Sequence, residues 1–155
     1  MKIFVPYLLF AYLALAVQSV FFHGIKPDLV LLLVCFYSVR CGQVKSVAYG
    51  AVAGLLIDTA SGFILGPNII SKSLAAFLAS TIRENLFQWN PIISTLMVAV
   101  LSFIDVMLVY ICFETFSSVS FVNRSLWISA LEVVYTVAAA LILYPVFNRR
   151  EKGLI

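Results

Sequence analysis

The chain has 155 residues, of which 63% are hydrophobic and 11% are charged, and its formal net charge is +3. Soluble domains are roughly 45–50% apolar and about 25% charged, so this composition excludes a soluble globular enzyme. It also excludes a disordered chain, because there is ample apolar surface to bury. The class that remains is a polytopic membrane protein.

Apolar runs separated by short polar turns predict six membrane-spanning helices. A helix needs roughly 20 apolar residues to cross a hydrocarbon core of about 30 Å, and six such helices use about 120 residues. The expected helices span approximately residues 3–22, 27–40, 46–65, 68–83, 91–116 and 125–147. The predicted fold is therefore all-α, a six-transmembrane-helix bundle that forms a single domain over residues 1–155. Function must then lie within the bundle, in its turns or on its outer surface.

The distribution of lysine and arginine predicts the orientation. If the N-terminus lies inside, the inner side holds Lys2, Arg40, Lys45, Arg83, Arg149, Arg150 and Lys152. The outer side then holds at most Lys26, Lys72 and Arg124. The positive-inside rule therefore predicts that the N- and C-termini are both cytoplasmic. These scattered basic residues give no indication of nucleic acid binding, and the last of them are expected to contact anionic membrane lipids.

The third predicted helix carries a stripe of small residues with one acid. Gly50, Gly54, Asp58 and Gly62 recur at every fourth residue, so they lie on one slowly drifting face. Two glycines at this spacing allow another helix to approach closely in lipid. We interpret the stripe as a groove for helix packing or for a partner helix, with Asp58 facing protein or a wet cavity. The alternative is a packing groove that holds one buried carboxylate.

Ionisable residues on four predicted helices indicate a polar layer in the outer half of the membrane. At about 1.5 Å per residue, Asp58 lies roughly 18 Å, Asp105 about 21 Å and Glu132 roughly 20 Å from the inner edge. Lys72 lies about 4–5 Å below the outer edge, and its flexible stem reaches down toward Asp58. Acids inside the membrane are functional candidates, so we expect a hydrated pocket open to the outside or carboxyl groups kept protonated. The alternative is that each acid faces a different direction and caps a local group.

Motifs for other chemistry are absent from the sequence. The single histidine, His23, lies in a predicted turn, and no phosphate-binding glycine loop is present. Cys35, Cys41 and Cys112 are odd in number and form no metal-binding pattern. We therefore expect no catalytic residues, no metal, no cofactor and no disulfide.

Two segments resemble the rod shape-determining protein MreD family. Residues 25–33, IKPDLVLLL, resemble the opening of that family's second helix, with Pro27 and Asp28 as the turn residues. Residues 54–68, GLLIDTASGFILGPN, resemble its G-L-L-x-D segment followed by S-G and L-G-x-N, which end in Gly66 and Asn68 here. The match in motifs covers about residues 25–85. Pro67 departs from the family, which often has a small or apolar residue there.

The resemblance implies a non-enzymatic subunit of the bacterial cell-elongation complex in the cytoplasmic (inner) membrane. Such a subunit would bind the transmembrane helix of MreC, as part of an oligomer with it. Through MreC it would be linked to RodA, to a class B penicillin-binding protein and to MreB, and it would help to organise peptidoglycan synthesis and maintain cell shape. The resemblance also implies a fold similar to the substrate-binding subunits of energy-coupling-factor transporters.

A second hypothesis remains open from the residues alone. Asp58, Lys72, Asp105 and Glu132 would line an outward-facing polar pocket, and the chain would be a small-molecule-binding or transport subunit. Pockets between bundle helices are common ligand sites. A ligand bound to the purified protein would favour this hypothesis over the scaffold.

Overall fold

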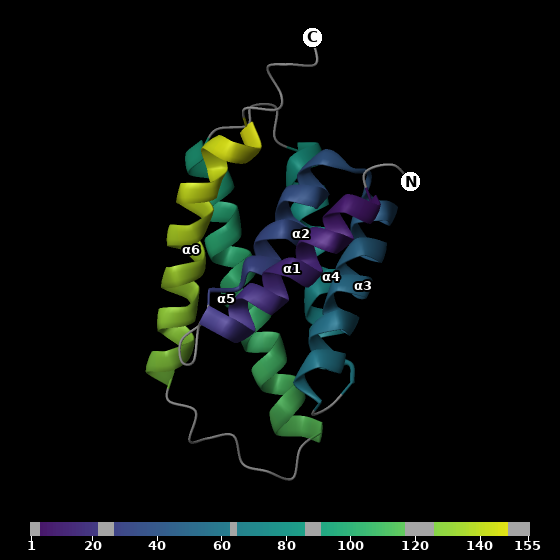
Figure 1. Cartoon of the computed structure of the whole chain (residues 1–155). Coiled ribbons are helices and arrows are strands. Elements are labelled where there is room, and N and C mark those ends of the chain that lie inside the picture. The colour runs from purple at the N-terminus through teal and green to yellow at the C-terminus, as the bar shows by residue number, and fades with distance from the viewer. Residues whose placement is uncertain (1–3, 22–26, 63–64, 86–90, 117–125, 149–155) are drawn as a thin grey trace.

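A computed structural model of the protein describes residues 4–21, 27–62, 65–85, 91–116 and 126–148 (Figure 1). These residues form only helices, which confirms the all-α prediction for the described part of the chain. The six helices are α1 (Phe4–Phe21), α2 (Leu29–Arg40), α3 (Gln43–Ser61), α4 (Pro67–Asn85), α5 (Pro91–Phe116) and α6 (Leu126–Asn148). The first residues of α1 and the last turn of α6 lie at the same end of the bundle, the upper end in Figure 1.

Several helix boundaries differ from the sequence prediction by one to four residues, and two of these differences have clear local reasons. The second helix begins at Leu29 rather than at residue 27, because Asp28 is its N-cap. The third helix ends at Ser61 rather than at residue 65. Gly62 adopts a left-handed conformation with φ 68°, and its N–H donates to the Asp58 carbonyl at 3.2 Å. Glycine adopts this conformation without a steric penalty, so it ends the helix and directs the chain into the turn before α4.

The short helix α2 is the centre of the bundle. It contacts each of the other five helices, and α1 crosses in front of it in Figure 1. Its buried residues lie all around the helix: Val30, Leu31, Leu32, Val34, Cys35, Phe36, Tyr37 and Ser38. A helix that is apolar on every face belongs in a core, which explains why this run is both short and uninterrupted by charge.

The core divides into two clusters on either side of α2. One joins α2 to α4, α5 and α6 and contains Leu31, Leu32, Cys35, Phe36, Ala75, Ala79, Met97, Val98, Leu101 and Ala140. The other joins α2 to α1, α3 and α4 and contains Tyr7, Ala11, Val30, Val34, Tyr37, Tyr49, Ala53 and Ala76. In the second cluster the rings of Tyr37 and Tyr49 stack at 4.4 Å, and the Tyr49 hydroxyl donates to the Tyr7 carbonyl at 2.9 Å.

The outer surface of the described helices is strongly apolar. On α5, Ile92 is 80% exposed and Leu96 is 64% exposed, and large apolar side chains also project from α1 and α6. One described segment, Ile92–Cys112, is long and apolar enough to cross a membrane by length and composition. The shorter apolar segments are Phe4–Val20, Leu29–Arg40 and Ala130–Ile142. The arrangement of six membrane spans therefore stays a prediction.

Candidate functional site: a buried ionic cluster at the start of α2

The start of α2 is held by contacts from several helices. The Leu31 N–H donates to Asp28 Oδ1 at 2.8 Å, so Asp28 caps the helix. The Asp28 N–H donates to Thr136 Oγ1 on α6 at 2.9 Å. The Gln18 side-chain amide on α1 donates to the Pro27 carbonyl. The two turn residues, Pro27 and Asp28, thus join the first, second and sixth helices.

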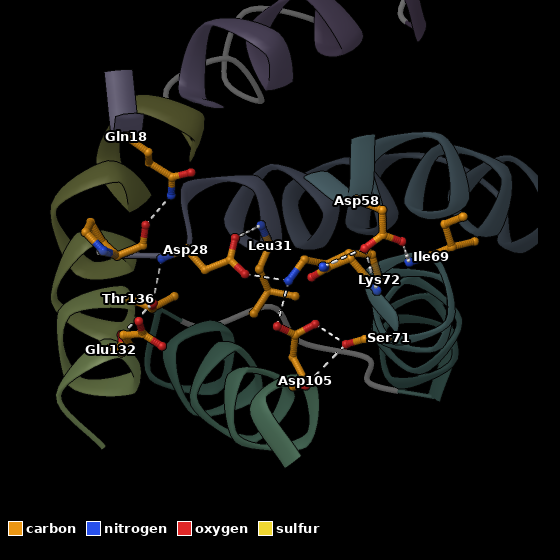
Figure 2. Close-up of polar contacts among 12 residues, drawn as sticks. Gln18, Asp28, Leu31, Asp58, Ile69, Ser71, Lys72, Asp105, Glu132 and Thr136 are labelled. Carbon is orange, nitrogen blue, oxygen red and sulfur yellow. Dashed lines mark hydrogen bonds and ion pairs between the residues drawn. The ribbon is translucent and has the colours of Figure 1, made fainter. Parts of the chain in front are cut away.

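Lys72 on α4 lies between two aspartates (Figure 2). Its Nζ atom pairs with Asp28 Oδ2 and with Asp105 Oδ2 on α5, the latter at 2.6 Å. The Lys72 side chain is 1% exposed, that of Asp105 is 6% exposed, and that of Asp28 is 28% exposed. The Ser71 hydroxyl donates to Asp105 Oδ1. We call Asp28, Lys72 and Asp105 the ionic cluster.

The ionic cluster makes the register of three helices interdependent. A buried charge is costly unless it is paired and its hydrogen-bonding atoms are satisfied. Among the described residues, no buried side-chain nitrogen or oxygen lacks a hydrogen-bond partner. The Lys72 ammonium can pair with both carboxylates only while α2, α4 and α5 keep matching axial positions, so the cluster favours one alignment of the three helices.

Asp58 is separate from the ionic cluster and caps α4. Its Oδ2 accepts from the N–H groups of Gly66 at 2.9 Å and of Ile69 at 3.3 Å. Its Oδ1 accepts from the Asn68 N–H at 3.2 Å and from the Asn68 side-chain amide at 2.8 Å. A carboxylate at a helix N-terminus satisfies donors that have no partner within the helix and interacts favourably with the helix dipole. Lys72 therefore reaches Asp28 and Asp105 rather than Asp58, the partner suggested by the depth estimates.

Replacing Asp58 with alanine is expected to destabilise the protein by about 1–2 kcal/mol, because it removes the cap and leaves backbone donors of Gly66, Asn68 and Ile69 unsatisfied. The measurement is the thermal unfolding midpoint of the purified protein in detergent. Glu84→Ala is the control, since Glu84 is an exposed acid at the other end of α4. Equal midpoints for the two variants would contradict the capping role.

The glycine stripe packs against a helix of the same chain. A Cβ atom on Gly50 would lie 2.5 Å from the Lys72 carbonyl oxygen. One on Gly54 would contact the Asn68 carbonyl oxygen and would lie 2.6 Å from Ile69 Cα. Since α4 occupies this close approach, a partner helix has no access to Gly50 and Gly54. Gly62 caps the C-terminus of α3.

The predicted polar layer is therefore divided among different sites. Lys72 and Asp105 lie together, whereas Asp58 lies near the end of α3 and binds the start of α4. Glu132 lies on α6 one turn before Thr136, and its carbonyl accepts from the Thr136 hydroxyl at 2.7 Å (Figure 2). Sequence reasoning assigned Asp28 to a turn and missed it in the layer. The depth estimates assumed that every helix begins at a membrane edge, whereas α2 begins beside the middle of α5.

In the part of the chain that the structure describes, no side chains are arranged for metal or thiol chemistry. No group of three or more histidine, cysteine, aspartate or glutamate side chains there is placed to hold a metal ion. Cys35 is buried, Cys41 and Cys112 are half-buried, and none of the three is in a disulfide. His23 and the C-terminal basic residues lie outside the described residues.

Comparison with known proteins identifies one family. The family model described as rod shape-determining protein MreD matches residues 1–149, which is nearly the whole chain. No curated protein and no solved structure matches the chain.

Proposed function

The chain belongs to the rod shape-determining protein MreD family, and from this premise we propose that it is a non-enzymatic scaffold of the rod complex that binds MreC. Members of this family are membrane proteins of the system that determines rod shape. In the proposal the chain contacts MreC directly and contacts RodA, the class B penicillin-binding protein and MreB only through it. Its effect is to organise peptidoglycan synthesis.

The observation that carries this proposal is that the polar groups of the interior are used within the chain. Lys72 is bound by Asp28 and Asp105, and Asp58 is bound by the start of α4. Lys72, Asp58 and Asp105, whose side chains are almost fully buried, stabilise one structure in this way and are not free to act on a substrate. What the described helices leave open is their apolar outer surface, which suits contact with lipid and with partner helices.

We further propose six spans in the cytoplasmic membrane with both ends of the chain in the cytoplasm. The positive-inside distribution supports this, as does the position of the start of α1 and the end of α6 at one end of the bundle (Figure 1). Reporter fusions after residue 155 and after residue 25 test it. Fluorescent protein is expected to be active only at the first position and periplasmic phosphatase only at the second, and the reverse pattern would overturn the orientation.

The scaffold role predicts a stable complex and a shape defect. An affinity-tagged chain solubilised in mild detergent is expected to co-purify MreC from the same organism, whereas a tagged multi-pass protein of unrelated function is not. Depletion of the chain is expected to convert rods into spheres. Rods that persist after complete depletion, or purification of the chain without MreC, would contradict the proposal.

A second candidate function is suggested by one observation. The Asp28 side chain is 28% exposed although its partner Lys72 is almost fully buried, so the ionic cluster has an open side. A small-molecule-binding or transport subunit would use such an opening for a ligand. Mass spectrometry of the protein purified under native conditions distinguishes the two functions, since this candidate requires a stoichiometric small molecule that Asp28→Asn removes.

A further inference from the structure

The core-facing side of α5 loses part of its cover beyond Asp105. Ser94, Val98, Leu101 and Asp105 follow one another at spacings of three or four residues and are at most 5% exposed. The same face continues through Leu108, Val109 and Cys112, which are only half-buried. The opposite face is exposed over the whole described length, as Phe103 and Met107 show. The change at Asp105 therefore concerns the face that elsewhere belongs to the core.

The helix α6 shows the same change at the same level. Thr136 and Ala140 are 1% and 3% exposed and face the core. One turn earlier, Val133 lies on the same side of the helix and is half-buried. No described residue of α6 before Thr136 is buried, among those whose side chains are described.

The cause is the position at which α2 begins. Asp28, the cap of α2, contacts Thr136 on α6 and shares Lys72 with Asp105 on α5. Figure 2 shows Asp28 with its backbone N–H toward Thr136 and its carboxylate toward the Lys72 ammonium. Beyond Asp105, α5 continues for 11 residues to Phe116, a rise of about 16 Å along which α2 offers no cover. We call Leu108, Val109, Cys112 and Val133, with Asp28 at one end, the open stripe.

Resting on the proposed function, we infer that the open stripe receives an apolar transmembrane segment of the partner, which brings a lysine or arginine side chain to Asp28. Leu108, Val109 and Cys112 lie on one side of α5, so together they can pack against one side of a partner helix. The ionic cluster holds two carboxylates and one ammonium, a formal charge of −1, so its open side is complementary to a cation. Lipid chains would instead leave the open side of Asp28 against hydrocarbon, which is unfavourable.

A photo-crosslinking experiment tests the position of the partner. The tagged chain is expressed with MreC, with a photoreactive amino acid at Val109 or at Met107. The two positions lie half a helical turn apart on α5, and Met107 faces away from the core. Irradiation is expected to capture MreC from Val109 at least fivefold more than from the control at Met107.

The outcomes separate this inference from the proposed function. Capture from Met107 and not from Val109 overturns the open stripe as the binding surface, and so does co-purification without capture from either position. In both cases MreC binding itself stands. Failure of MreC to co-purify at all overturns the proposed function and the inference together.

The charge of Asp28 is tested separately. In Asp28→Asn the cap of α2 is retained, because asparagine and aspartate are equally good N-caps, and Lys72 keeps Asp105. Loss of a charge-assisted hydrogen bond is expected to weaken MreC binding about tenfold. Glu114→Gln, which removes an exposed acid near the end of the same α5, is expected to leave binding unchanged. Unchanged binding by Asp28→Asn in a protein of normal thermal stability would overturn the role of the carboxylate.

Discussion

Lys72→Met is expected to lower the free energy of unfolding by about 3–5 kcal/mol, because it leaves the buried Asp105 carboxylate and the partly exposed Asp28 carboxylate without their cation. Methionine keeps the unbranched side chain as far as Cε and most of its apolar contacts, so the change isolates the ammonium group. The Asp105 side chain is 6% exposed, so water cannot replace its lost partner without opening the junction of α2, α4 and α5.

The measurement is thermal unfolding in detergent together with the yield of folded protein in the membrane. Lys45→Met is the matched control, since Lys45 is an exposed lysine on α3, and its midpoint should equal that of the parent. Adding Asp28→Asn and Asp105→Asn to Lys72→Met should recover part of the loss, since neutral side chains no longer require a cation. A midpoint for Lys72→Met within the error of the parent would show that the ionic cluster does not stabilise the fold.

Gly54→Ala is expected to destabilise the isolated chain by about 1–3 kcal/mol or more, through overpacking against a backbone that cannot move alone. The added Cβ would contact the Asn68 carbonyl oxygen and would lie 2.6 Å from the Asn68 carbonyl carbon and from Ile69 Cα. Relief requires α3 and α4 to separate at the point where Asp58 caps α4, so the cap is weakened as well. The loss occurs with or without a partner, because the contact lies within the chain.

Gly42→Ala is the control for Gly54→Ala. Nothing lies within 4 Å of a Cβ built on Gly42, and its φ of −68° suits any residue. Thermal midpoints of both variants, measured with and without MreC, test the prediction. A Gly54→Ala variant with a normal thermal midpoint for the chain alone but weakened binding of MreC would contradict this prediction. It would show that the glycine stripe is a groove for the partner.

The glycine spacing shows which part of the helix packing could be predicted from the sequence. Repetition at every fourth residue correctly indicated that Gly50 and Gly54 share a face that allows close approach. It did not indicate which helix approaches, because any helix that lacks bulky side chains at the contact satisfies the same spacing. The neighbouring helix in the chain, α4, occupies the contact, and a short connection from Gly62 to Gly66 favours such antiparallel pairing.

The arrangement of the polar residues was likewise only partly predictable from the sequence. Asp58, Lys72 and Asp105 stand out in apolar runs, so the sequence alone marked them as costly and therefore as paired or functional. Their pairing depends on the depth at which each helix starts, which hydropathy does not report. Asp28 was missed for this reason, since a residue between a proline and an apolar run is typical of a turn at the membrane surface.

The sequence by itself determined that this is a helical protein of apolar exterior in the MreD family, because composition, hydropathy and the GLLID segment are local properties. The tertiary structure decided which charges meet and which faces remain open. Those outcomes depend on the relative axial position of the packed helices, in which one residue corresponds to about 1.5 Å. The short α2, which begins beside Asp105, sets that position for Lys72 and leaves the open stripe beyond it.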